Sequence, residues 1–171
     1  PISLDPAATW RSLLSMLPAV TLFLVVLSLG MKMRRTLVLL MLAIVLVSVL
    51  LDLLQMMGGP DSPLRFYTIT NPDRAVGFFA NSNHNAAFLY CAIPFASAWA
   101  IGLVADQRQH RVLGVALTGL LLASVIIGLA LTHSRAGFAL GIFAGLASLA
   151  LAWRLGQGRL RRSLVLVGVA G

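Results

Sequence analysis

Apolar stretches long enough to cross a lipid bilayer constrain this chain more than any other feature of its sequence. A helix of roughly 18 residues or more covers the ~30 Å thickness of a hydrocarbon core. Five stretches reach that length, and the only charged residue in any of them is Asp52: 12–30, 36–57, 86–105, 112–132 and 136–153. Helices satisfy their own backbone hydrogen bonds in lipid, and the alternating pattern of a membrane strand is missing. The sequence therefore predicts an all-α, polytopic transmembrane helical bundle.

The composition agrees with a membrane environment. Hydrophobic residues make up 59% of the 171 residues and charged residues only 11%, which is unlike an ordinary soluble domain. A further apolar run begins at Ser163 and stops at Gly171, which predicts a truncated sixth span after the five complete ones. Because the first residue is also not methionine, we expect 1–171 to be a single membrane domain and a fragment of a larger membrane protein.

The distribution of basic residues predicts an orientation. The net charge is +8, and four of the thirteen Lys and Arg residues lie on one side of the predicted bundle: Arg11, Arg65, Arg74 and Arg135. The other nine lie in the alternate loops, which the positive-inside rule places in the cytoplasm. The connection 58–85, the only long one, then falls on the outer side. The basic residues form no patch interleaved with aromatic residues, so we do not expect a nucleic acid partner.

Two polar clusters fall on this predicted outer face. The first lies in "DRAVGFFANSNHNAAFL", which begins at Asp73, and the second in the tight turn "LTHSRAG", which contains His133. Each cluster precedes a predicted helix, and the candidate N-caps are Ser82 or Asn83 for one helix and Thr132 or Ser134 for the other. The free amide groups and the positive dipole end of such helices favour an anion.

The arginines of the two clusters need partners at the membrane boundary. An unpaired guanidinium is costly there, so Arg135 is expected to pair with a distant acid or with an external anion such as phosphate. The alternative is that Arg135 extends to the lipid headgroups. Arg74 can instead pair locally with Asp73. Asp52, an acid inside a span, is a functional candidate, although an arginine across the bundle would explain it equally well.

The other polar residues leave the catalytic group unassigned. Asn81, Asn83 and Asn85 can be caps and turn formers as readily as ligands. His84 has no second histidine at metal-ligand spacing, so no metal site is predicted, and His84 and Asp52 remain candidates for a catalytic role. In the last span, three glycines at four-residue spacing predict close helix packing, at positions Gly137, Gly141 and Gly145.

These two polar segments resemble a known family. "DRAVGFFANSNHNAAFL" resembles the arginine, glycine-phenylalanine and Asn-x-Asn segment that opens the shared domain of the O-antigen ligase and O-antigen polymerase family. "LTHSRAGFALGIFAG" resembles the family's second signature, a serine-arginine turn followed by an apolar span. The two occur in the family's order, with two spans between them, and cover 74–153. Ser82 stands where the family usually has proline.

The resemblance implies a membrane glycosyltransferase in the bacterial cytoplasmic (inner) membrane, with its active face outside. Such enzymes transfer a glycan from undecaprenyl pyrophosphate to a hydroxyl of the lipid A core, of another glycan or of a protein, without a metal or another cofactor. Arg74 and Arg135 match the arginines that hold the pyrophosphate, and Asn83 matches the second motif asparagine. The same two motifs contribute Asn81, His84 and Ser134 to the expected site. The family's candidate base, a histidine in a later outer loop, would lie beyond Gly171.

Two other functions fit parts of the sequence. A transporter for an anion or a lipid-linked sugar would place its polar residues near the middle of the membrane, whereas here they gather at one end. A noncatalytic protein that associates with another membrane protein would explain the row of glycines formed by Gly137, Gly141 and Gly145, which we call the glycine ridge.

Overall fold

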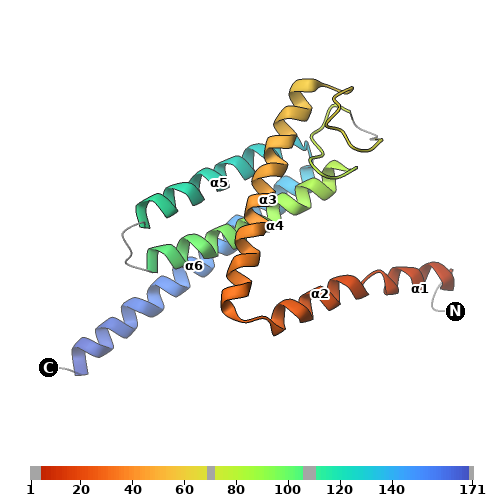
Figure 1. Cartoon of the computed structure of the whole chain (residues 1–171). Helices are drawn as coiled ribbons and strands as arrows, with labels where there is room; N and C mark the ends of the chain where they lie inside the picture. The colour runs from red at the N-terminus through yellow and green to blue at the C-terminus, as the bar shows by residue number, and fades with distance from the viewer. Residues whose placement is uncertain (1–4, 69–71, 106–110, 170–171) are drawn as a thin grey trace. The chain divides into compact units, whose positions relative to one another are not determined.

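The computed structural model describes residues 5–68, 72–105 and 111–169, and every regular element in these ranges is an α-helix (Figure 1). The helices are α1 (Pro6–Leu14), α2 (Leu17–Ser28), α3 (Met31–Gly58), α4 (Ser82–Ala105), α5 (Arg111–Leu131) and α6 (Arg135–Val169). Five segments are long and apolar enough to span a membrane: Pro6–Ser28, Met31–Gly58, Ser82–Leu103, Val112–Leu131 and Arg135–Arg154. For the described residues, the predicted all-α class is confirmed, and so is the presence of five segments long and apolar enough to span a membrane.

The chain divides into two compact units, Pro1–Leu40 and Met41–Gly171. In the first unit, the first span is broken into α1 and α2 instead of forming one helix over 12–30. The break falls just before Pro18, which stands near the start of α2. Proline has no N–H and its ring collides with the carbonyl four residues earlier, so a helix cannot run through this position without distortion.

The end of the second unit differs from the prediction. α6 has 35 residues and continues through the basic segment 154–162 to Val169. The apolar run from Ser163 is thus part of the same helix, and a separate sixth span is not confirmed. The segment contains no proline, and most of its residues are arginine or leucine, which are good helix formers, although Gly156 and Gly158 weaken the helix there.

Within the second unit, α4 packs along both α5 and α6 (Figure 1). Glycines allow this approach. A side-chain carbon added at Gly137 would collide with Cβ of Ala86, and one added at Gly141 would lie 2.9 Å from Cδ1 of Leu129. The predicted packing role is confirmed for these two glycines, whereas Gly145 has no neighbour within 4 Å.

Polar residues gather at one end of the second unit, which we call the loop end. It consists of the last turns of α3, the loop 59–81, the first turn of α4, the last turn of α5, the turn 132–134 and the first turn of α6. α3 ends at Gly58, and Gly59 follows with a φ of +70°, the left-handed conformation that commonly closes a helix. The loop is thus slightly shorter than the predicted 58–85.

Candidate functional site

Gln55, near the end of α3, holds the loop through its side-chain amide. The Nε2 group donates hydrogen bonds to the carbonyl oxygens of Leu64 (2.9 Å) and Gly77 (2.8 Å). The Oε1 atom accepts from the backbone N–H groups of Val76 (3.1 Å) and Gly77 (3.0 Å). The side chain is fully buried. Its amide thus supplies hydrogen-bond partners to two separate parts of the loop backbone, which would otherwise lack them.

Arg65 also binds the loop 59–81, through its guanidinium. Its Nε donates to the carbonyl oxygen of Gly59 (3.0 Å), its Nη1 to that of Arg74 (3.0 Å) and its Nη2 to that of Pro72 (2.7 Å). Three backbone carbonyls are therefore gathered around one guanidinium. We conclude that Arg65 is engaged within the loop, although the sequence identified it only as a cation on the outer side.

A buried chain of polar side chains links α3 to the start of α4. Ser48 Oγ donates to Asn85 Oδ1 (3.1 Å), and Asn85 Nδ2 donates to Asp52 Oδ1 (2.7 Å). All three side chains have 0% exposure, and Asp52 Oδ2 has no hydrogen-bond partner among the described residues. Among the described residues, the hydrogen-bond partner of Asp52 is the amide of Asn85 and not an arginine.

Gly77 allows the loop to approach this buried chain. Its φ is +55°, and an added Cβ would meet Ser48 Oγ and would lie 2.8 Å from Asn85 Oδ1. Both the backbone conformation and the lack of space require glycine. On the opposite side, Gly128 of α5 brings its backbone close to Asp52, where an added Cβ would lie 3.5 Å from Oδ2.

The two motifs identified in the sequence meet at the loop end. Ser134 Oγ donates to Asn83 Oδ1 (2.9 Å), across 51 positions of the chain. The same hydroxyl accepts from the N–H of Gly137 (3.1 Å), which makes Ser134 the N-cap of α6, as predicted. A second link joins the N–H of Ala75 to the carbonyl oxygen of Leu131 (3.0 Å). The two segments are thus held side by side by both side chains and backbone.

The cap of α4 differs from the prediction. Neither Ser82 nor Asn83 provides it; instead Asn81 Oδ1 accepts from the N–H of Asn83 (2.8 Å). Asn81, Asn83 and His84 are exposed, whereas Asn85 is fully buried. Of the candidate ligands in this motif, the first three are therefore open to a molecule at the loop end, and Asn85 is a structural residue.

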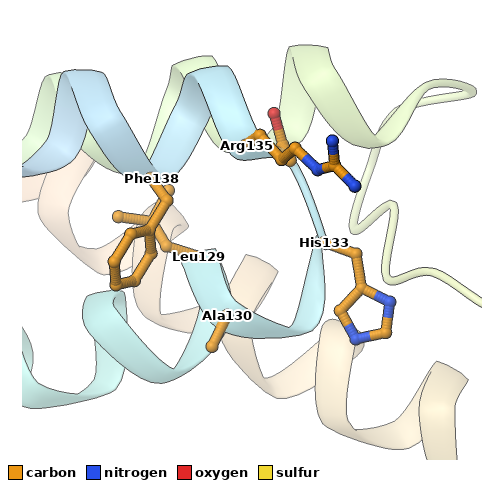
Figure 2. Close-up of a pocket in the computed structure, with 6 residues that line it drawn as sticks. Leu129, Ala130, His133, Arg135 and Phe138 are labelled. Atoms are coloured by element: carbon orange, nitrogen blue, oxygen red, sulfur yellow. The ribbon is translucent and has the colours of Figure 1, made fainter.

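The two predicted anion-binding arginines occupy the joined segments. Arg74 is partly buried, and its Nε is inaccessible to solvent and has no hydrogen-bond partner among the described residues. Arg135 is exposed at the first position of α6. Figure 2 shows its guanidinium on the same side of the turn as the imidazole of His133. An open hollow of about 370 Å³ adjoins this turn, lined by Leu129, Ala130, His133, Ser134, Arg135 and Phe138.

The turn holding these two residues is conformationally unusual. His133 has a φ of 49°, which is uncommon for a residue other than glycine. Thr132 Oγ1 accepts from the N–H of Ser134 (3.3 Å), and the carbonyl oxygen of Ala130 accepts from the N–H of His133 (3.1 Å). These bonds fix the conformation of the short connection between α5 and α6. The side chains of His133 and Arg135 both project from this connection (Figure 2).

The arrangement is suited to an anion at a membrane surface. Arg135 and the N-terminus of α6 contribute positive charge and free donors at the hollow, which adds the apolar surfaces of Phe138 and Leu129. Arg74 lies on the segment joined to this turn but is not among the residues that line the hollow. Among the residues that the structure describes, no group of three or more His, Cys, Asp and Glu side chains is placed to hold a metal ion.

Three residues that organise the loop end did not stand out in the sequence: Ser48, Gln55 and Arg65. A usable signal existed for Gln55, since it is one of few polar side chains in an otherwise apolar stretch. Ser48 shares that property, but serine also occurs in lipid-facing helices, where its hydroxyl bonds to its own backbone. Nothing in the local sequence of Arg65 distinguishes it from a solvated loop cation.

Comparisons with known proteins give no match: no family model, no curated protein and no solved structure is significantly similar to this chain. The resemblance to the O-antigen ligase and polymerase family therefore depends on the two motifs alone.

Proposed function

We propose that this chain belongs to a membrane glycosyltransferase that transfers a glycan from undecaprenyl pyrophosphate to an acceptor hydroxyl. The acceptor would be a lipid A core, another glycan or a protein. The observation that supports this function best is the junction of the two motifs through Asn83 and Ser134 and through Ala75 and Leu131. This junction brings together two short segments, each of which carries one of the arginines expected to bind the pyrophosphate.

The chemistry requires stabilisation of negative charge. The bond between the sugar's anomeric carbon and the phosphate oxygen breaks, the acceptor oxygen bonds to that carbon, and the acceptor proton passes to a base. The electron pair of the broken bond leaves with the diphosphate. Preorganised donors aimed at the developing charge lower the barrier, each by on the order of 3 kcal/mol. Arg74, Arg135 and the first amide groups of α6 would supply such donors.

Two features of Arg74 and Arg135 support an external anion as their partner. Burial of a polar nitrogen without a hydrogen bond is costly, and Arg74 Nε is in that state. Arg135 is exposed beside a hollow that has both polar and apolar walls. A lipid-linked pyrophosphate would satisfy the donors with its phosphate oxygens while its hydrocarbon chain stays in the bilayer. The distribution of basic residues favours an outer location for this end of the protein.

The test is a transfer assay with the complete protein, a lipid-pyrophosphate glycan and an acceptor. Arg74→Ala and Arg135→Ala are each expected to reduce the transfer rate on the order of 10²-fold, the usual effect of removing one charge-stabilising donor. Arg154→Ala is the matched control, because Arg154 is also an exposed arginine of α6 but lies some 19 residues further along the helix. Wild-type transfer by both loop-end variants would refute the proposed roles.

A transporter for an anion or a lipid-linked sugar is the alternative, and buried Asp52 is the observation that favours it. Ionisable residues inside spans often mark the pathway of an ion or substrate. Transporter sites are typically formed by interrupted helices near the membrane midplane, whereas α3, α4, α5 and α6 are each assigned as one continuous helix. Solute uptake into proteoliposomes without a covalent product would favour the transporter.

A further inference from the structure

We infer that Gln55 and Arg65 are positioning residues of the proposed pyrophosphate site, and that they act through Arg74. This inference depends on the proposed function. Neither side chain is placed to hold a ligand itself, because their polar groups are already bonded to the loop backbone. Their common effect is to immobilise the backbone on both sides of Arg74.

Arg65 immobilises the N-terminal side. Its guanidinium binds the carbonyl oxygens of Pro72 and of Arg74 itself, and its Nε binds that of Gly59 at the beginning of the loop. Bonds of a charged donor to a carbonyl are stronger than bonds between neutral groups. The planar guanidinium offers donors in fixed directions, so lysine cannot reproduce the three bonds from a single nitrogen atom with the same geometry.

Gln55 immobilises the C-terminal side. Its amide makes two donated and two accepted hydrogen bonds. Three of them engage Val76 and Gly77, just after Arg74, and the fourth is donated to the carbonyl oxygen of Leu64. Glutamine is the residue that this requires, because its side chain carries both donors and an acceptor. Glutamate would keep the two accepted bonds and lose the two donated ones, and methionine would lose all four.

The backbone of Arg74 is thereby held in place and also tied to α5. Arg65 binds the carbonyl oxygen of Arg74, and Gln55 binds the N–H of Val76. The residue between them, Ala75, donates its N–H to the carbonyl oxygen of Leu131. Leu131 directly precedes the turn that leads to Arg135. The conformational entropy of ordering the Arg74 backbone is therefore lost on folding and not on ligand binding, which favours tight and well-oriented binding.

The experiment uses the complete protein in lipid nanodiscs and measures the affinity for inorganic pyrophosphate by calorimetry, together with glycan transfer. Misplacement of a catalytic contact by about 1 Å costs on the order of 10²-fold in rate. We expect Gln55→Met and Arg65→Ala to approach that loss in transfer and to weaken pyrophosphate binding. Gln55→Glu and Arg65→Lys, which keep part of the bonding, are expected to lose less. Arg154→Ala is the control for the loss of a positive charge.

Double substitutions separate positioning from a general effect on folding. In the Arg74→Ala background, Gln55→Met and Arg65→Ala are expected to cause no further loss of pyrophosphate affinity, because the residue through which they act is gone. In the Arg135→Ala background, the same substitutions are expected to keep their full effect. Thermal unfolding of each variant is followed in parallel, and Arg65→Lys provides the test if Gln55→Met does not fold.

The outcomes distinguish the two proposals. If Arg74→Ala leaves both pyrophosphate affinity and transfer unchanged, the proposed function is overturned. If Arg74→Ala weakens both but the Gln55 and Arg65 variants behave as wild type, only the positioning inference is overturned. It is also overturned if these variants lose affinity equally with and without Arg74.

Discussion

At the scale of single residues, backbone groups and amides are the partners of charged side chains at the loop end. An arginine partner was one of two interpretations of Asp52, and the structure instead bonds Asp52 to the amide of Asn85. Arg65 bonds to backbone carbonyls and not to an acid. Arg74 Nε is left without a partner among the described residues. The charged side chains Asp52 and Arg65 are thus held at the loop end by an amide and by backbone carbonyls.

Gly77 provides a prediction about stability at this scale. Gly77→Ala is expected to lower the free energy of unfolding by about 2–4 kcal/mol, because a left-handed alanine is strained and its Cβ would overlap Ser48 and Asn85. The matched control is Gly59→Ala, where φ is also positive but no atom lies within 4 Å. Its expected cost is about 1 kcal/mol. Reversible unfolding in mixed detergent micelles measures both; equal costs would contradict the overlap.

Asp52 provides a second prediction. Asp52→Leu removes the acceptor of the Asn85 amide inside a fully buried site, and an unsatisfied buried donor costs about 1–3 kcal/mol. Asp52→Asn keeps an oxygen in the accepting position and is expected to cost less than half as much. The same unfolding measurement compares the two variants. If leucine proves no more destabilising than asparagine, the buried hydrogen bond is not an important contribution to stability.

At the scale of elements, small residues determine how closely α4, α5 and α6 pack. Lipid is as apolar as the helix surfaces, so the hydrophobic effect contributes little to their association and close van der Waals contact contributes more. Gly137 and Gly141 provide that contact on α6, and Gly128 provides it on α5 against α3 and α4. Because Gly137 lies within one turn of Ser134, this packing also positions the N-terminus of α6 at the loop end.

The glycine ridge of α6 provides a matched pair of substitutions. Gly137→Ala is expected to destabilise the second unit by about 1–3 kcal/mol, since its Cβ would collide with that of Ala86. Gly145→Ala, on the same helix and with free space, is expected to change stability by less than about 1 kcal/mol, with helix propensity favouring alanine. Similar losses for both variants would show that α4 and α6 do not pack as described.

At the scale of the whole molecule, the described residues contain five segments long and apolar enough to span a membrane. If the last of them, Arg135–Arg154, crosses a bilayer, the loop end and Arg154 lie on opposite sides of it. The orientation is a prediction from charge, because basic residues cluster in the alternate loops. It puts the loop end, where both predicted arginines lie, on the outer surface. A lipid-linked substrate exposed on that surface would reach it by moving within the membrane plane.

Cysteine labelling in intact cells tests this orientation. The single native cysteine is first removed with Cys91→Ala. A membrane-impermeant maleimide is expected to label Asp61→Cys in the loop from outside, and to label Arg154→Cys at the end of the last span only after the membrane is permeabilised. The reverse pattern would place the loop end in the cytoplasm and would be incompatible with the proposed reaction outside it.

The sequence by itself determined the helical class and the approximate positions of five segments able to span a membrane, because apolar length is a local property that lipid makes decisive. It also indicated both polar clusters and offered Ser134 as one of two candidate caps for α6. Only the tertiary structure decided which polar side chains meet. Gln55 and Val76, and Asn83 and Ser134, are joined across 21 and 51 positions. Such bonds depend on how α3, α4 and α5 approach one another, and no local pattern of residues carries that information.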